Sequence, residues 1–483
     1  MVTPARGQDG SSGGGREGRP WLVALGAVAL AAMGVDLVLR LPAAVSLNYG
    51  EGFLLFDALR EARGGDLYGD PSRVPWTIQT YTPLYLWLVS LAARLGAEGY
   101  AAARLIGYAS LLATALVVAR AGRGRSGATA WGVAALYLTL PLFVSWGAAV
   151  RPDNLAVLLA ALGVSLADDL AGRRAVLWTL PLFLASGLAK QSTVAAPAAA
   201  LLWLALRDRG AAWRFAALGA AGLGLSLGVL ELGSGGWFWL HAVESHAAKP
   251  YRLEQLAGVC RAFLAFHALP AAAGLALMLF LARRGRLSAT WLWLALSGVA
   301  AAASAGKSGS DTNYFLEPAA ALALLAAREL PPPRELRPGA RAWVGAGALA
   351  LAAWHLFVHL ANSAWIPGAE ERFRLVVERF DGVEGPVLSD DAGFLLASGR
   401  PLWLQPFIMT QLAAAGLWDE GPVVDGLRAG DFALVIVQRQ PAAVFRSRYT
   451  PAMRRALAER YGRVDAYRTE FELEVLAPRR TGP

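Results

Sequence analysis

Charged residues that could perform acid–base chemistry lie beside long apolar segments of this chain. Glu51 stands between two glycines, in a turn that follows the first apolar segment. An ionised carboxylate at such a place can accept a proton from a hydroxyl group, which makes Glu51 a candidate general base. The alternative is a solvated loop acid with an ordinary pKa near about 4.3. Asp153 is the second catalytic candidate.

Three basic residues interrupt other apolar segments. Arg151 precedes Asp153 in a short connection, Lys190 breaks the run Leu180–Leu206, and Lys307 opens a stretch of small polar residues. Such cations are partners for phosphate, and the small residues after Lys307 could form a backbone cradle for an anion. The alternatives are helix capping at Arg151–Asp153 and snorkelling of Lys190 to the membrane interface.

Six more residues are predicted to contact a substrate. Glu317 lies in an apolar segment, on the same helical face as Tyr314, and therefore needs a partner such as Lys307 or Arg151. The full set of additional candidates is Tyr81, Arg104, His241, Asn313, Tyr314 and Glu317. The sequence shows no partner for Arg104.

Metal-ligand spacing is weak throughout the chain. Asp153 has no paired acid, His241 and His246 are five residues apart, and Cys260 is the only cysteine. His355 and His359 have i, i+4 spacing, but we interpret them as packing residues of a helix bundle. The sequence therefore predicts no cofactor, and although a divalent metal is possible it has no support.

The elements that must position these residues are apolar helices. Hydrophobic residues make up 56% of the 483 residues, and five segments are long enough to cross about 30 Å of hydrocarbon: Trp21–Leu39, Ala128–Val150, Phe215–Leu232, Val259–Leu281 and Ala342–Leu360. We expect a mainly α polytopic transmembrane bundle over residues 20–362. The Gly/Ser-rich residues 1–19 are predicted to be a disordered cytoplasmic tail.

The distribution of arginine predicts the orientation of the chain. Arginine-rich connections should face the cytoplasm, and about eleven spans place every such cluster inside. This count requires Tyr81–Leu95 to be an interfacial or re-entrant helix within an outer loop of about residues 41–99. Glu51 and the three lysines of the chain (Lys190, Lys249 and Lys307) then lie on the outer side. The net charge of +9 arises in the loops between spans, so nucleic acid is not an expected partner.

The last segment has a different pattern. Residues 366–483 alternate predicted strands (Pro386–Asp390, Phe432–Val437, Arg468–Ala477) with predicted helices (Pro406–Gly416, Pro451–Tyr461). This order favours a small α/β domain, which the topology places outside the membrane.

These features resemble the GT-C superfamily of polytopic membrane glycosyltransferases, near the protein-mannosyltransferase and aminoarabinose-transferase-like families. The resemblance covers about residues 21–325 and is carried by Glu51, by the Tyr-Thr-Pro-Leu-Tyr stretch Tyr81–Tyr85 and by the turn Arg151–Asp153. It implies sugar transfer from a polyprenyl-phosphate donor, with the first-loop acid as base and basic residues on the leaving phosphate. The single Glu and the lack of an Asp-x-Asp pair depart from the family pattern.

The resulting hypothesis is an inverting glycosyltransferase of the cell envelope, set in the plasma or inner membrane. Its acceptor would be a hydroxyl of a lipid, glycan or protein at the outer face. A transporter or flippase of lipid-linked sugars is the first alternative, but it predicts charges at mid-span. A non-catalytic membrane scaffold is the second, and it gives no reason for Glu51 or Glu317.

Overall fold

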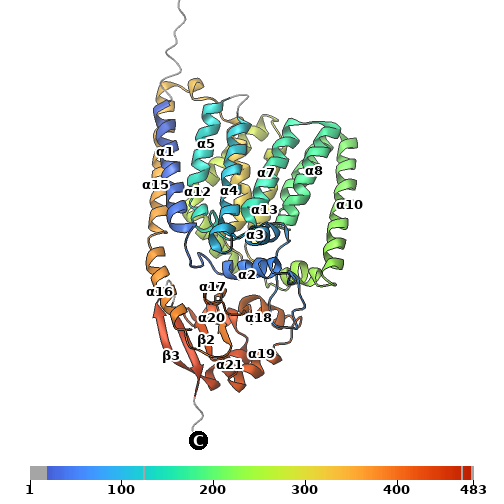
Figure 1. Ribbon diagram of the computed structural model, residues 1–483. Helices are drawn as coiled ribbons and strands as arrows, with labels where there is room; N and C mark the ends of the chain where they lie inside the picture. The colour runs from blue at the N-terminus through green and yellow to red at the C-terminus, as the bar shows by residue number, and fades with distance from the viewer. Residues whose placement is uncertain (1–18, 123–125, 469–471, 480–483) are drawn as a thin grey trace, which may run out of the picture.

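The computed structural model describes residues 19–122, 126–468 and 472–479. The predicted tail therefore lies outside the described residues, apart from Arg19. Long helices form one bundle, with a smaller α/β part beyond one end of it (Figure 1). The long helices are α1 (Arg19–Val35), α4 (Tyr100–Ala121), α5 (Gly127–Thr139), α7 (Asp153–Asp169), α8 (Gly172–Ala189), α9 (Ala195–Arg207), α10 (Arg209–Gly233), α12 (Leu253–Arg283), α13 (Ala289–Ser304), α14 (Leu316–Glu329) and α15 (Pro338–Ala361).

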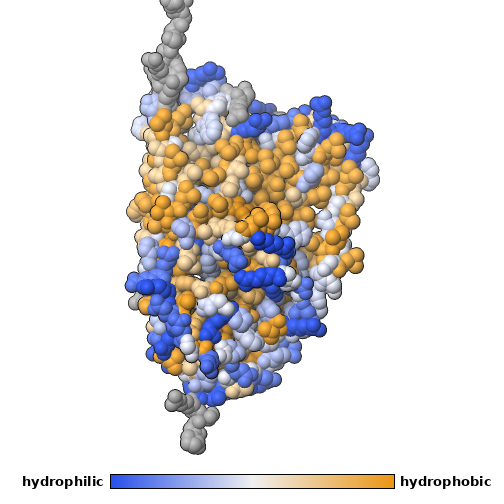
Figure 2. Space-filling view, in the orientation of Figure 1, coloured by the Kyte–Doolittle hydropathy of each residue, from blue (hydrophilic) through white to orange (hydrophobic). Residues whose placement is uncertain are grey.

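The bundle has the composition of a membrane protein. Five helical stretches among the described residues are long and apolar enough to cross a bilayer. Figure 2 shows hydrophobic side chains gathered over the bundle and hydrophilic ones at its upper end and over the lower part of the molecule. The chain is thus a multi-pass membrane protein. The count of eleven spans stays a prediction, because several bundle helices are short.

Short helices occupy the loop of residues 41–99, which the sequence predicts to lie on the outer side. Helix α2 (Glu51–Ala62) and helix α3 (Leu84–Arg94) pack against each other through buried Leu55, Leu59 and Leu86. Both lie between the bundle and the C-terminal part (Figure 1). With only 11 residues, α3 is too short to cross a bilayer.

The C-terminal region, Ile366–Arg479, contains a four-stranded sheet of order β1-β2-β4-β3. Strands β1 (Val387–Ser389) and β2 (Leu434–Gln438) are parallel, and β4 (Glu472–Pro478) is antiparallel to both β2 and β3 (Tyr461–Arg468). The helices of this region are α16 (Ile366–Glu378), α17 (Ala392–Ala397), α18 (Pro406–Ala414), α19 (Gly421–Ala429), α20 (Ala442–Arg448) and α21 (Pro451–Arg460).

One prediction for this region was wrong. The sequence pattern indicated a single final strand, but the structure has two, because the chain turns from helix to strand at Tyr461. Tyr461 is buried and Gly462 follows it, and glycine disfavours continuation of the helix.

The outer loop and the C-terminal region share apolar packing. Trp76 donates its backbone N–H to Trp403 (2.8 Å) and accepts one from Gln405 (2.9 Å), so a short parallel bridge joins the two. Trp76 and Ile78 belong to the same buried cluster as Leu404 and Ile408. The C-terminal region is therefore joined to the loop of residues 41–99 by backbone hydrogen bonds and by apolar packing.

Candidate functional site

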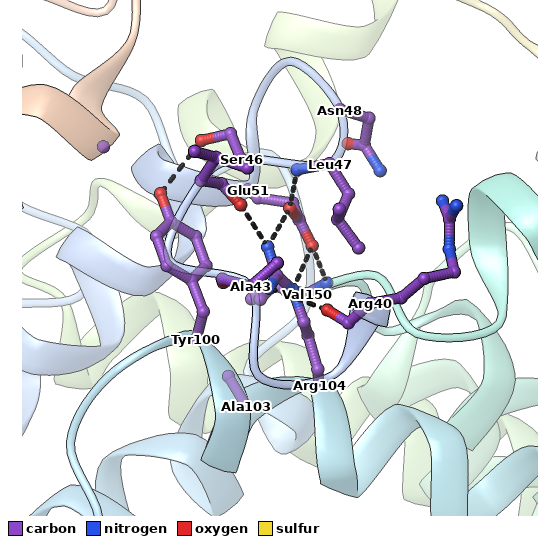
Figure 3. A network of polar contacts seen from close by, with 12 residues as sticks. Arg40, Ala43, Ser46, Leu47, Asn48, Glu51, Tyr100, Ala103, Arg104 and Val150 are labelled. Carbon is purple, nitrogen blue, oxygen red and sulfur yellow. Dashed lines mark hydrogen bonds and ion pairs between the residues drawn. The ribbon is translucent and has the colours of Figure 1, made fainter. Parts of the chain in front are cut away.

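Glu51 lies at the first position of α2 and forms a buried ion pair with Arg104 of α4 (Figure 3). Both side chains are 0% exposed. Arg104 Nε and Nη2 lie 3.2 Å and 2.9 Å from the two carboxylate oxygens. The backbone N–H groups of Leu47 and Val150 donate to the same oxygens, at 2.5 Å and 2.6 Å. Four donors fill the acceptor capacity of a carboxylate, so Glu51 has no oxygen free for a substrate hydroxyl.

Arg104 also fixes the chain that leaves the first span. Its guanidinium donates to the backbone carbonyls of Arg40 (3.0 Å) and Ala43 (2.5 Å) (Figure 3). It also donates to the backbone carbonyl of Val45 (2.6 Å). All its contacts are internal, which differs from the prediction that Arg104 binds a substrate. The general-base role of Glu51 stays a prediction that this geometry does not favour.

A cavity of about 610 Å³ lies between the bundle and the C-terminal region. Five cationic residues line it: Arg151, Lys190, Lys249, Lys307 and Arg448. Asn48, Tyr81, Asn313 and Tyr314 also line it. The structure thus brings together most of the predicted substrate-binding residues.

Arg151 is held against the outer loop. Its guanidinium donates to the Tyr81 hydroxyl (2.9 Å), to Asn48 Oδ1 (3.0 Å) and to the Tyr49 carbonyl (2.5 Å). Gly50 adopts a φ of 100°, and a Cβ there would lie 2.8 Å from Arg151 Nη2. A glycine at this position therefore permits both the turn and the close approach of the arginine.

Lys190 and Asp153 form a second ion pair, with Nζ 2.5 Å from Oδ1. Asn313 donates to the same oxygen at 2.9 Å, and Lys190 Nζ lies 5.3 Å from the centroid of the Tyr314 ring. Asp153 is 2% exposed, and its Oδ2 has no hydrogen-bond partner among the described residues. Asp153 thus lies behind Lys190, in a position to orient the ammonium.

Glu317 lines a smaller cavity of about 40 Å³ that Asp153 and Lys190 also line. Its Oε1 accepts a hydrogen bond from Trp293 Nε1 at 2.7 Å. The predicted partners, Lys307 and Arg151, make no ion pair with Glu317. That prediction was wrong because an indole of the neighbouring helix α13 supplies the donor.

The loop between α10 and α12 adds groups that were not predicted to bind a substrate. Lys249 is half-buried and makes one long contact, 3.4 Å, with His246 Nδ1. Burial and three neighbouring cations lower the pKa of Lys249 to about 8. Burial and the charge of Lys249 also lower the pKa of His246, to about 3, so this imidazole is neutral.

His241 does not line the cavity. Its Nδ1 accepts the backbone N–H of Gln79 (3.0 Å), and its Nε2 donates to the carbonyl of Gly69 (2.8 Å). Burial lowers the pKa of His241 to about 4. This histidine joins the connection between α10 and α12 to the loop of residues 41–99, so its contact with a substrate stays a prediction that this geometry does not favour.

The cavity has an excess of positive charge. Within the described part of the chain, no carboxylate lies within 4 Å of the cationic groups of Arg151, Lys249 or Lys307. Arg448, from the C-terminal region, pairs with Asp390 at 3.2 Å and lies 4.1 Å from the centroid of the Tyr49 ring. An anionic ligand would relieve the repulsion among these cations.

An apolar groove of about 410 Å³ runs between α8, α9 and α10. Its lining includes Leu184, Gly187, Leu201 and Gly219. Gln191 lines both the groove and the charged cavity. The arrangement suits an amphiphile with an anionic head and a long apolar tail.

Sequence reasoning missed Asn48, Tyr49, Gln191, His246, Lys249 and Arg448 as lining residues. For Lys249 the signal was present, because it is one of only three lysines and lies in an outer connection. Arg448 gave no signal, since it is one of many arginines in a charge-balanced region. No three His, Cys, Asp or Glu side chains in the described residues are grouped so that they could hold a metal ion.

The comparison with solved structures settles the fold. ArnT from Cupriavidus metallidurans bound to undecaprenyl phosphate superposes with a TM-score of 0.62 at 16% identity, over 96% of this chain and 99% of that one. The chain has the GT-C fold.

A second GT-C structure agrees with this assignment. The Archaeoglobus fulgidus oligosaccharyltransferase, tethered with an acceptor peptide, gives a TM-score of 0.52 at 14% identity, over 96% of this chain and 74% of that one. No protein-family model and no curated protein sequence matches the chain. The likeness is therefore one of fold, and the activity has to be argued from the site.

Proposed function

We propose that this chain is a membrane glycosyltransferase that moves a sugar from a polyprenyl-phosphate donor to an acceptor at the outer face of the membrane. The observation that carries the proposal is the cavity with three cations that lack a carboxylate partner, beside an apolar groove. The ArnT structure of the same fold contains undecaprenyl phosphate, which supports this class of donor.

The charge of the cavity suits the chemistry of the departing phosphate. A sugar phosphodiester carries one negative charge, and the polyprenyl phosphate that leaves it carries nearly two at pH 7. Cations that gain attraction as this charge develops stabilise the transition state more than the ground state. Arg151, Lys249 and Lys307 would contact the phosphate, while Lys190 is oriented toward it by Asp153.

The apolar groove would hold the polyprenyl tail. Most of its residues come from the three helices α8, α9 and α10, which would face the bilayer, so a lipid could enter from the side. Gln191 marks the place where the groove and the cavity meet, and there the phosphate would lie between the tail and the sugar. The charges lie at one end of the bundle, which favours a transferase over a transporter.

The acceptor would be a hydroxyl of a lipid, glycan or protein that reaches the cavity between the bundle and the C-terminal region. Direct attack of this hydroxyl on the anomeric carbon would invert the configuration of the sugar. The orientation that this requires has the N-terminus in the cytoplasm and the C-terminal region outside.

Binding of undecaprenyl phosphate to the purified protein in nanodiscs tests the proposal. We expect Lys307→Ala and Arg151→Ala each to weaken binding by about 1.5–3 kcal/mol, the range for a charge-assisted contact. Arg174→Ala, an exposed arginine at the start of α8 that is outside the cavity, is the matched control. Unchanged affinity in both cavity variants would show that Lys307 and Arg151 do not bind the phosphate.

A further inference from the structure

Sugar transfer to a hydroxyl requires a proton acceptor that faces the cavity. Most of the nearby carboxylates are unsuitable, because protein groups occupy their oxygens or because they do not line the large cavity. Glu51 accepts four hydrogen bonds from the protein. Asp153 lies behind Lys190 and lines only the smaller cavity. Asp390 accepts bonds from the Tyr449 hydroxyl, the Gln438 backbone and Arg448.

Asp311 is the only carboxylate among the described residues that line the large cavity. Its side chain is exposed, and its Oδ1 accepts the backbone N–H of Thr312 at 2.6 Å. No described residue donates a hydrogen bond to its other oxygen, Oδ2. His246 is the only imidazole among the described residues of the wall, and with a pKa of about 3 it is a weak base.

The loop that carries Asp311 is held from two sides. The backbone N–H of Ser308 donates to the carbonyl of Pro250 (2.8 Å), and the side-chain amide of Gln255 donates to the carbonyl of Ser310 (2.7 Å). Gly309 packs so closely on Phe407 of the C-terminal region that a Cβ there would lie 2.9 Å from the ring. The loop therefore keeps the Asp311 carboxylate at a fixed place relative to Lys307, which the same loop carries into the cavity.

We infer that Asp311 is the general base of the transfer reaction, an inference that rests on the proposed glycosyltransferase function. The acceptor hydroxyl gives its proton to Asp311 Oδ2 while its oxygen forms the new bond to the anomeric carbon. The bond between that carbon and the phosphate oxygen breaks, and its electron pair leaves with the polyprenyl phosphate. The carboxylic acid then returns the proton to bulk water, which the exposed position of Asp311 allows.

Transfer and binding by the full-length protein in nanodiscs test this role separately. Undecaprenyl phosphate is the binding probe, and undecaprenyl-phosphate sugars with radiolabelled hexoses or pentoses are the transfer probes. Asp311→Asn should bind undecaprenyl phosphate like the wild type but transfer sugar about 10²–10⁴-fold more slowly. Asp311→Glu should restore part of the rate, and added formate should accelerate Asp311→Gly, since the site is open to solvent.

Asp419→Asn is the matched control, because Asp419 is also exposed and also accepts a backbone N–H, from Gly421 at 2.8 Å. It should transfer sugar at the wild-type rate. Wild-type transfer by Asp311→Asn would overturn the assignment of the base and leave the proposed function intact. A wild-type protein that neither binds undecaprenyl phosphate nor transfers any sugar would refute the proposed function, and the inference with it.

Discussion

Glu51 and Arg104 form an ion pair that has no contact with water, and removal of one partner leaves the other charge buried. We expect Glu51→Gln to destabilise the protein by about 3–5 kcal/mol, the usual cost of breaking a buried pair. Thermal unfolding followed by tryptophan fluorescence should show a lower Tm. The double variant Glu51→Gln/Arg104→Met should recover part of this loss, because it leaves no unpaired charge.

The same variant separates a structural role from a catalytic one. If Glu51→Gln unfolds at the wild-type temperature and loses only its transfer rate, Glu51 is the base after all. Glu61→Gln, in the same helix, is the control. Glu61 is partly exposed and pairs with the exposed Arg94, so its loss should change the Tm little.

Lys249 should make donor binding dependent on pH. Its pKa of about 8 means that it is cationic at pH 7 and mostly neutral at pH 9. The second ionisation of a phosphate monoester has a pKa near about 6 and is nearly complete at pH 7, so the lysine should account for most of the change. We expect the affinity for undecaprenyl phosphate to fall up to about tenfold between pH 7 and pH 9, as the cationic fraction of Lys249 falls.

Lys249→Arg supplies the control for this dependence. An arginine stays protonated over the whole range, so its binding curve should be flat from pH 7 to pH 9. A wild-type curve as flat as that of the arginine variant would show that Lys249 does not contact the phosphate.

At the scale of elements, the groove between α8, α9 and α10 allows the tail to be tested apart from the head group. A Cβ at Gly187 would meet nothing within 4 Å, so Gly187→Leu should fold normally and fill the groove. We expect weaker binding of undecaprenyl phosphate and unchanged binding of a water-soluble alkyl phosphate. The measurement is a titration of both ligands in nanodiscs.

Gly224→Leu is the matched control, since Gly224 lies in α10, has the same free space and is outside the groove lining. Equal affinity of the Gly187 and Gly224 variants for the long lipid would place the tail elsewhere.

The sequence predicted the apolar helices and the gathering of Arg151, Lys190 and Lys307 at one site better than it predicted their partners. Periodicity and charge along the chain indicate helices. They do not indicate that Arg104 pairs with Glu51, because the two residues are 53 positions apart and only the packing of the helices brings them together. In the same way, Glu317 accepts a hydrogen bond from the indole of Trp293, which belongs to another helix. Burial decides the role of such residues, and a single sequence does not report which of two charged residues faces a cavity.

At the scale of the whole molecule, the proposed orientation has a direct test. In a Cys260→Ala background, Asp425→Cys in the C-terminal region and Arg174→Cys at the start of α8 both place a thiol at an exposed site. An impermeant thiol reagent added to intact cells should label the cysteine at position 425 only. Labelling of position 174 instead would invert the topology and move the cavity to the cytoplasmic face.

The bridge between Trp76 and Leu404 also affects how the chain is made. The two residues are 328 positions apart (404 − 76), and at about 5–20 residues per second their synthesis is separated by about 16–66 s. During that interval Trp76 and Ile78 lack the C-terminal members of their buried cluster, such as Leu404 and Ile408. A nascent chain that stops before residue 404 therefore leaves part of the apolar surface of Trp76 and Ile78 uncovered, even though the rest of the loop can already pack on the bundle.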